Sequence, residues 1–540
     1  MFIDSSKTTK NGKTYTRHTL RNSYRDKATG KVRHINIANL TKFPEAEINA
    51  IKLALKHKNN LSVLIDSEGI SLQQGKSFGA LHILREIANK LGIENAINLQ
   101  IKNQKHAKLA LWQIIARCIY QGSKLTAHRM SHHQALEEIL GLENFSQDDV
   151  YDNLSIIMEH RDSIEKQLFK QHSKCSNLFL YDVTSSYFEG ECNEYAQYGY
   201  NRDKKSGKQQ LVIGLLTNDN GVPVASRVFD GNTVDNKTVA EQINLLANDF
   251  GVKKVTLVGD RGMLKSPQIE LLPEGFNYIT AISKVQIETL ISKNVIQPEL
   301  FDYELSEVVD NNIRYIMRLN PTRRDEIRAT RDAKTKKLKQ FIDEQNLYLK
   351  EHTKAKLNVA VKKVNNKLER YNLNYITIGK DDDSRVISIV IDKNLLENTE
   401  KFDGCYCLKT DILDCNKSII HQRYKDLSKV ESAFRTMKTE CLELRPIYVR
   451  KKESTDAHVF IVTLSYMIIQ ELEKLLHEQT PHKVLEVIGL FNTLTYVEVN
   501  TGQNSFVRLP TPTPEIQKLI ELTKVTLPVL NKKIKVAQNQ

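Results

Sequence analysis

The chain has 540 residues, of which 40% are hydrophobic and 26% charged, a composition typical of a globular protein that can bury a large core without disulfide or metal staples. The N-terminus lacks an apolar signal core, the longest apolar run (residues 458–469) is too short to cross a bilayer, and seven irregularly spaced cysteines favour a reducing compartment. We therefore expect a cytoplasmic protein of several domains with no membrane segment. A formal net charge of +13 favours a polyanionic partner such as nucleic acid, although a merely basic protein fits it equally well.

Residues 1–60 predict a basic β-hairpin followed by a linker. The alternating stretch Y-T-R-H-T-L-R-N-S-Y-R is followed by D-K-A-T-G-K and V-R-H-I-N-I, as in two strands joined by a turn. The first 40 residues contain nine Lys and Arg residues against Asp4 and Asp26. Such a hairpin is often a solvated cap, but this excess of positive charge favours contact with phosphate.

Residues 61–173 predict a mainly α-helical region. F-G-A-L-H-I-L-R-E-I-A-N-K-L-G has apolar residues at helical spacing and ends in Gly92, and a later helix opens with Ser146 as its N-cap. Short helices in a basic protein favour DNA binding. No sharp helix-turn-helix signature is present, however, and a plain helical domain fits the pattern equally well.

Residues 174–285 contain the most informative order of elements. A strand centred on Asp182 is followed by a hairpin about the turn N-D-N-G, a helix that ends at Gly251, a short buried strand that ends at Asp260, and one further strand, F-N-Y-I-T-A-I-S-K. Strand, strand, strand, helix, strand is the opening of a ribonuclease-H-like α/β fold. We interpret these residues as the first part of a catalytic core.

Asp182 is an acid in an otherwise hydrophobic strand, L-F-L-Y-D-V-T-S-S-Y-F-E-G, where an unpaired charge is costly. If its strand lies beside the strand of Asp260 and runs parallel to it, the two carboxylates converge at one sheet edge. Close carboxylates need protons or a divalent cation, and Mg²⁺ prefers such oxygen ligands. The pattern therefore predicts a metal site.

Residues 286–410 interrupt this order, and we interpret them as an insertion of basic helices followed by strands. The stretch 323–370 is strongly basic; a solvated helix pair explains it, but an insertion beside the last acid can also follow DNA. Residues 411–480 are expected to return to the core, and residues 481–540 to form a helical tail.

Glu431 is the candidate for a third acid. In Y-K-D-L-S-K-V-E-S-A-F-R-T-M-K it lies beside the apolar stripe of an amphipathic helix, with Tyr424 and Lys438 seven residues to either side and hence on nearly the same face. An acid between a phenol and an ammonium suits a site for metal and phosphate. On spacing alone, a solvated helix face with Glu–Lys pairs is the favoured explanation.

The motifs D-V-T-S-S-Y-F, V-G-D-R-G-M and Y-x₆-E-x₆-K followed by L-E-L-R-P-I-Y-x-R occur in this order along the chain. Together they resemble insertion-sequence DDE transposases, most closely the branch of the IS-four superfamily with a Y-R-E-K signature. The resemblance runs from the N-terminal hairpin to the helix after Glu431. It implies a ribonuclease-H-like transposase that cuts phosphodiester bonds by metal-dependent hydrolysis and transfers the freed 3′-OH ends to target DNA.

The resemblance implies a role for each candidate residue. Asp182, Asp260 and Glu431 are expected to be the catalytic triad that binds paired Mg²⁺ or Mn²⁺ ions, and Tyr424 and Lys438 are expected to contact the DNA backbone.

One position departs from the family pattern. Y-x₂-R-x₃-E-x₆-K has an arginine where this chain has Leu427. The phosphate contact of that arginine is therefore absent or supplied by a neighbour such as Lys425 or Arg435.

The expected partners are double-stranded DNA, as terminal inverted repeats and target, and a second copy of the chain in a synaptic homodimer. Two alternatives are another two-metal nuclease of the same fold and a non-catalytic DNA-binding descendant. A zinc site formed by C-Y-C-L-K-T-D-I-L-D-C with His421 is less favoured than incidental cysteines, because the usual spacing of paired cysteines is missing.

Overall fold

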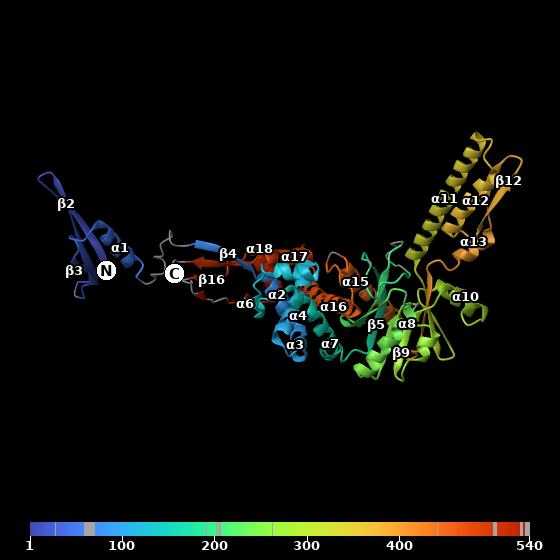
Figure 1. Ribbon diagram of the computed structural model, residues 1–540, viewed down its shortest axis with the longest axis horizontal. Helices are drawn as coiled ribbons and strands as arrows, with labels where there is room; N and C mark the ends of the chain where they lie inside the picture. The colour runs from blue at the N-terminus through green and yellow to red at the C-terminus, as the bar shows by residue number, and fades with distance from the viewer. Residues whose placement is uncertain are drawn as a thin grey trace. The chain divides into compact units, whose positions relative to one another are not determined.

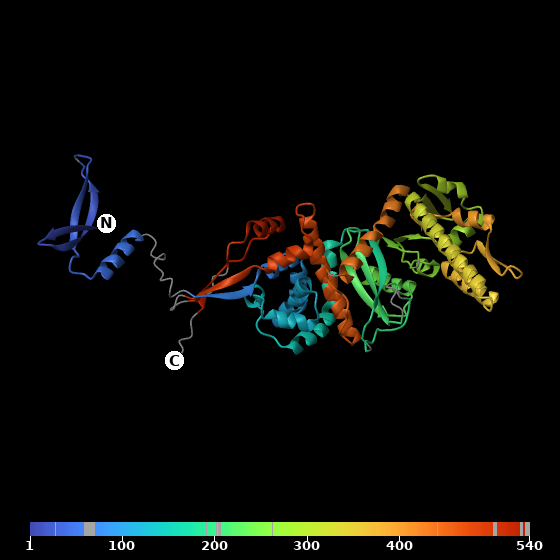
Figure 2. The same cartoon turned by 90° about the horizontal axis from the view of Figure 1, so that it is seen from above.

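The computed structural model describes residues 1–27, 29–58, 71–190, 192–200, 202, 207–261, 263–439, 441–500, 505–529 and 533–534. They form a mixed α/β protein (Figures 1 and 2). The chain divides into two compact units, the first made of residues 1–79, 493–515 and 527–540 and the second of residues 80–492 and 516–526. Among the described residues the strands pair into four sheets, two in each unit.

The first unit begins with an antiparallel sheet and one helix: β1 (Phe2–Lys10), β2 (Lys13–Arg25), β3 (Val32–Asn39) and α1 (Glu45–Lys56). β1 and β2 are joined by Asn11 and Gly12, whose φ angles of 53° and 75° give the two-residue connection that matches the strand twist. The predicted basic hairpin corresponds to β2 and β3. β1 is a further strand that the sequence interpretation did not include.

The other sheet of this unit has the order β17-β16-β15-β4. It contains β4 (Ser71–Ser77), β15 (Thr495–Asn500), β16 (Ser505–Arg508) and β17 (Lys533–Ile534). The prediction of helix throughout 61–173 and of a helical tail over 481–540 is wrong at these strands. β4 reads S-L-Q-Q-G-K-S, which has little β-propensity, and its partner comes from the far end of the chain, so no local signal marks it. Residues 59–70 lie outside the described residues.

The second unit begins with the predicted helical region. Its helices are α2 (Gly79–Lys90), α3 (Ile93–Gln100), α4 (Gln104–Tyr120), α5 (Lys124–Ser131), α6 (Leu136–Leu140) and α7 (Gln147–His172). Gly92 ends the first of them with a φ of 74°, and Ser146 caps α7 in a capping box with Asp149, as predicted. That this region binds DNA stays a prediction.

The central sheet of the second unit has the order β10-β11-β14-β9-β8-β5-β6-β7. β5 pairs in parallel with β8, and β8 with β9, whereas β6 and β7 form the predicted antiparallel hairpin. The bounds are β5 (Leu178–Tyr187), β6 (Gln210–Asn218), β7 (Pro223–Asp230), β8 (Val255–Gly259), β9 (Phe276–Ala281), β10 (Ser306–Asp310), β11 (Ile313–Leu319) and β14 (Cys405–Thr410). The predicted helix before β8 is α8 (Asp235–Asn244), extended by a π-helical turn over Leu245–Asp249.

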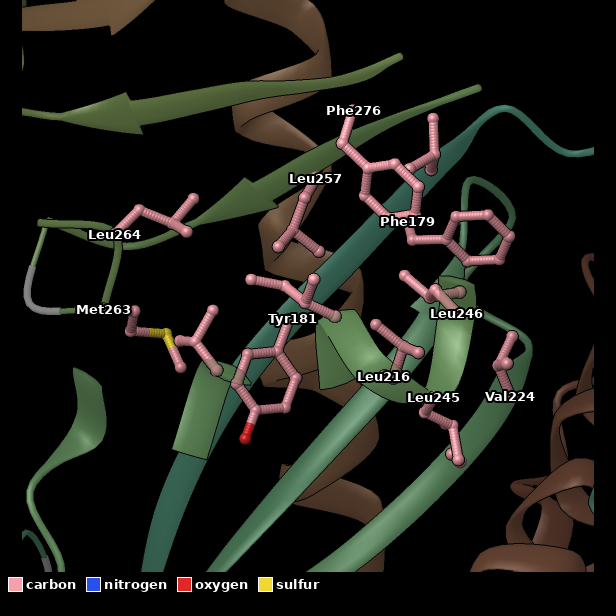
Figure 3. Packing of buried hydrophobic residues seen from close by; sticks show 14 of the residues in the cluster. Phe179, Tyr181, Leu216, Val224, Leu245, Leu246, Leu257, Met263, Leu264 and Phe276 are labelled. Carbon is pink, nitrogen blue, oxygen red and sulfur yellow. The ribbon is translucent and has the colours of Figure 1, made fainter. Parts of the chain in front are cut away.

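One face of this sheet packs on the helical turn that follows α8. Figure 3 shows Phe179 and Tyr181 of β5 in a buried cluster with Leu245, Leu246 and Leu257. Because side chains of a strand alternate between faces, the odd-numbered residues of β5 fill this cluster and the even-numbered residues, Asp182 among them, point to the opposite face.

The remaining short helices of the core are α9 (Ser266–Glu270), α10 (Lys284–Ser292) and the 3₁₀ helix η4 (Pro298–Asp302).

The inserted segment is shorter than predicted. It consists of α11 (Pro321–Glu351), α12 (Leu357–Tyr371), β12 (Ile376–Asp381), β13 (Val386–Ile391) and α13 (Lys393–Glu400). α11 and α12 run side by side (Figure 1), and the segment has its own buried cluster. β10, β11 and β14, which the sequence interpretation placed in the insertion, belong to the central sheet. Periodicity identifies a strand, but it does not identify the sheet that the strand joins.

After β14 the chain continues through α14 (Lys417–Lys425), α15 (Leu427–Lys438) and α16 (Lys452–Leu476). The predicted single helix around Glu431 is therefore two helices, separated at Asp426. α16 is largely buried and contacts α4, α7 and β7, so it joins the helical region to the sheet.

Candidate active site

Asp182 and Asp260 lie on neighbouring strands. β5 and β8 are parallel, and Tyr181 lies opposite Gly259. Asp182 and Asp260 directly follow these two residues. Asp182 continues the even-numbered face of β5, whereas Asp260 is exposed just beyond the end of β8. The parallel pairing of the two strands, the condition for the predicted convergence, is thus confirmed, and it brings the backbones of Asp182 and Asp260 side by side.

Glu431 approaches from the helix packed against this face. α15 contacts β5 and buries Leu427, Val430, Phe434 and Met437, the apolar stripe that the sequence predicts. This stripe fixes the helix on the sheet and leaves Glu431 on its exposed side. The negative charge of Glu431 is near enough to Asp182 to raise the pKa of that carboxyl.

Tyr424 and Lys438 contact the same two strands. The Tyr424 hydroxyl donates a hydrogen bond of 3.1 Å to Oδ1 of Asp260. Burial, and then the Asp260 charge, raise the pKa of Tyr424, so this phenol stays protonated and remains a donor. Lys438 donates from Nζ to Oγ1 of Thr184 at 2.6 Å and to the carbonyl of Ser185. All five candidate residues therefore lie around the middle of β5 and the end of β8.

Burial dominates the electrostatics of Asp182. It raises the pKa of this carboxyl to about 7. The Val183 backbone N–H, which donates to its Oδ1 at 2.8 Å, and the positive charge of Arg202 act to lower the pKa, whereas the charges of Asp260 and Glu431 raise it further. The site is thus rich in negative charge and has too little positive charge to balance it.

The donor set fits a hard divalent cation, because three carboxylates and a phenol supply only oxygen atoms. In the described part of the chain, no group of three or more His, Cys, Asp or Glu side chains lies close enough together to hold a metal ion. The three acids share an electrostatic environment without forming a closed coordination shell.

Leu427 occupies the position of the signature arginine, and its side chain is only 8% exposed. It lies in the buried stripe of α15, so this position serves packing. Arg435 and Lys438 instead border a cavity of about 1110 Å³ beside the site, together with Tyr187 and Arg445. The Arg445 guanidinium stacks over the Tyr187 ring at 4.7 Å from its centroid.

Two contacts were missed by the sequence interpretation. Thr184, which accepts from Lys438, shares a face of β5 with Asp182, and strict alternation in D-V-T would have indicated it. Arg202 donates its backbone N–H to Oγ of Ser185 at 2.9 Å and pairs with Asp235 at 2.5 Å. It comes from the loop after β5, and no sequence pattern places that loop beside the acids.

The less favoured zinc interpretation finds no support in the geometry. Cys407 lies in a buried apolar cluster and His421 stacks on Tyr406. Among the described residues, no helix is long and apolar enough to cross a membrane.

Two models of transposase families match the chain. A model of the Transposase DDE domain matches residues 173–468, and a model of the IS1634 family transposase, N-terminal domain, matches residues 3–63. No curated protein was found to match the chain.

A cryo-EM structure of a piggyBac transposase synaptic complex with hairpin DNA is similar to this chain over 78% of its length and 82% of that chain, with 8% identity and a TM-score of 0.33. A likeness this weak supports no statement about the fold. The DDE domain model covers more than half of the 540 residues and contains all five candidate residues. The chain therefore belongs to the DDE transposases, the enzymes of insertion sequences that transfer phosphoryl groups of DNA with divalent metal ions.

Proposed function

We propose that Asp182, Asp260 and Glu431 are the triad with which this transposase cuts transposon ends and joins them to target DNA. The observation that carries the proposal is that the acids come from a central strand, the end of its parallel neighbour and the helix packed on them, and that the charges of Asp260 and Glu431 both act on Asp182. The finer assignment, a ribonuclease-H-like core of the IS-four branch, is supported by the order β7-β6-β5-β8-β9 and by the spacing Y-x₆-E-x₆-K.

The triad would hold paired Mg²⁺ or Mn²⁺ ions, which when bound activate the attacking oxygen and neutralise charge at the phosphate. Asp182 must lose its proton before it binds a cation, and its pKa of about 7 makes this step depend on pH. Tyr424 orients the Asp260 carboxylate through its hydroxyl. Lys438, held by Thr184 and Ser185, keeps a positive charge beside the acids, where a scissile phosphate would lie.

The partners in this proposal are the terminal inverted repeats, the target DNA and a second copy of the chain, since two ends must be held together for joining. All seven cysteines are free thiols, which supports a reducing compartment such as the cytoplasm.

Cleavage of a duplex that carries one transposon end tests the triad. With Mg²⁺ or Mn²⁺, the wild-type protein is expected to cut at the end, and Asp182→Asn, Asp260→Asn and Glu431→Gln are each expected to abolish cutting, because each removes a metal-binding charge. Glu143→Gln changes an exposed acid in a loop before α7 and should leave cleavage unchanged.

DNA binding is measured on the same variants without metal, so that a loss of cleavage is not confused with a loss of binding. Cutting by Glu431→Gln would remove Glu431 from the triad. A wild-type protein that binds ends and never cuts them would instead be a non-catalytic descendant.

A further inference from the structure

The sheet β1–β2–β3 has two different faces. His18 marks one of them: its Nε2 lies 3.6 Å from the carboxylate of Glu45 at the start of α1, and its Nδ1 is hydrogen-bonded to Ser5. α1 contacts β1 and lies on this side, which we name the helix face. The opposite side is the open face, formed in β2 by Lys13, Tyr15, Arg17, Arg21, Ser23 and Arg25, with Thr19 buried among them.

The register of β2 with β1 and β3 identifies the other residues of the open face. Opposite them on β1 lie Lys10, Thr8, Ser6, Asp4 and Phe2, and on β3 lie Asn39, Asn36, His34 and Val32. Two side-chain hydrogen bonds agree with this division, because Arg21 bonds Asn36 at 3.0 Å and Ser23 bonds His34 at 3.1 Å across the open face.

Positive charge is concentrated on the open face. The three strands contain seven Lys and Arg residues, and five of them lie on this face: Lys10, Lys13, Arg17, Arg21 and Arg25. Lys7 and Arg33 lie on the helix face. The strands contain one acid, Asp4, which is paired with Arg21 at 2.7 Å. The open face therefore carries four cations in excess, whereas charge scattered at random would be shared by both faces.

The shape of the open face suits a nucleic-acid duplex. Two outer strands of a three-stranded sheet lie about 10 Å apart, close to the width of about 12 Å of the major groove of B-DNA. Arg17, Arg21 and Arg25 follow one another every four residues, or about 14 Å, along β2, which corresponds to about four base-pair steps. Tyr15 is 60% exposed and adds a hydroxyl donor for phosphate oxygen.

We propose that the open face binds double-stranded DNA, with β2 along the major groove, and that it recognises the transposon end. Arg17 and Arg25 are both exposed and lie on either side of Arg21 along β2. They make the contacts with the DNA bases. This inference rests on the proposed function as a transposase. It assigns end recognition to the basic sheet, for which the sequence predicts contact with phosphate, rather than to the helices of residues 61–173, for which the sequence favours DNA binding.

Binding of the full-length protein to DNA without metal tests the inference. The probes are a duplex with the terminal inverted repeat and a scrambled duplex of equal length and composition. Arg17→Ala/Arg25→Ala is expected to weaken binding of the end duplex at least about tenfold and to reduce the salt slope of log K by about 2. Lys7→Ala/Arg33→Ala removes the same charge from the helix face and is expected to change binding less than about threefold. Equal losses for both variants, or no loss for the first, would overturn the proposal.

A variant that conserves charge separates recognition of DNA bases from nonspecific electrostatic attraction to phosphates. Arg17→Lys/Arg25→Lys keeps both charges but not the two-pronged donors that read guanine, so it should retain the salt slope and lose preference for the end over the scrambled duplex. An unchanged preference would contradict end recognition by this face. Stronger displacement of duplex DNA by polyglutamate or single-stranded RNA than by unlabelled duplex would contradict DNA as the partner.

These outcomes are distinct from those that test the triad. A wild-type protein that binds ends but does not cut them contradicts the triad and leaves this inference in place. A wild-type protein that cuts, together with an open-face variant that binds normally, contradicts only the inference. Thermal unfolding of every variant confirms that exposed substitutions leave the fold intact.

Discussion

Asp182 is unfavourable for folding, and the proposed triad requires it for function. Its strand neighbours Phe179, Tyr181 and Val183 anchor β5 in the core, and the alternation of the strand then fixes Asp182 on the opposite face. There it meets two further acids, and the free energy of the folded protein rises when all three are ionised. A bound cation removes this cost.

We predict that Asp182→Asn stabilises the metal-free protein at high pH. The pKa of Asp182 is about 7 in the folded protein against 3.8 ordinarily, so folding takes up a proton between these values and stability falls as pH rises from about 4 to about 7. Above pH 7 the full cost, on the order of 2–4 kcal/mol, is present. Thermal unfolding should show a higher midpoint for the variant at pH 8 and little difference near pH 4.

Asp414→Asn, at an exposed site, should shift the midpoint equally at both pH values. Mg²⁺ should stabilise the wild-type protein at pH 8 more than the variant. A variant that is less stable than wild type at pH 8 would show that burial and the neighbouring acids do not raise the pKa of Asp182.

Leu427 provides a second prediction. Replacing it with the signature arginine should destabilise the protein by about 2–4 kcal/mol, because a guanidinium would enter the buried stripe of α15. Cleavage per folded molecule should not increase. Leu413→Arg, at a side chain that is 44% exposed, is the matched control and should cost little. If Leu427→Arg folds normally and cuts faster, the signature position faces the DNA after all.

At the scale of elements, the insertion is attached through a buried ion pair. Arg331 of α11 is 9% exposed and bonds both carboxylate oxygens of Asp403, at 2.8 and 2.6 Å, and also Glu400 at 3.0 Å. Asp403 follows α13, the last element of the insertion. The ion pair therefore joins the first helix of the insertion to the residue Asp403, which follows its last helix.

Arg331→Ala should loosen this attachment by about 3–5 kcal/mol, since Asp403 would remain buried with only the more distant Arg328, at 3.9 Å, to pair with it. Hydrogen exchange should increase in α11 and α13 and stay unchanged in β5 and β8. Arg331→Ala/Asp403→Ala should recover part of the loss, whereas Arg323→Ala, which removes an exposed pair, should have little effect. Equal exchange in the single and double variants would mean that the unpaired acid is not the cause.

Local sequence patterns predicted most elements of the core, because strand alternation and the caps at Gly92 and Ser146 are encoded within a few residues. They did not predict the helix break at Asp426, where the backbone stays close to helical and no Gly or Pro marks the end. The pairing of β14 with β11 also has no local signature. For the site, strand order indicated Asp182 and Asp260, the family resemblance added Glu431, and the role of all three stays a prediction. The contacts of Arg202 and of Thr184 with Lys438 depend on loop placement and on tertiary packing.

At the scale of the whole molecule, the sequence indicated an α/β protein with helices before the core. It did not indicate that residues 493–515 join residues 1–79 in one compact unit. β4 and β15 are both short, and they lie far apart in the sequence. Their pairing forms only in the tertiary structure, so the sequence of either segment alone does not reveal it.

Each chain supplies one proposed triad, and joining requires two ends, so we expect two copies to assemble on a pair of end duplexes. Light scattering of the metal-free complex should give a mass of two chains and two duplexes, while the scrambled duplex should give no such species. A complex of one chain with two ends would contradict the synaptic homodimer.

The ends of the insertion meet within the sheet: Leu319 of β11 is the register partner of Cys405 of β14, and the backbone N–H of Asn320 donates to the carbonyl of Gly404 at 2.9 Å. The catalytic sheet is therefore continuous without the inserted helices, as if β11 and β14 were a hairpin. This junction is an insertion point between two paired strands. We expect that another folded segment with adjacent termini can replace the insertion here without moving Asp182 or Asp260, because neither acid lies on β11 or β14.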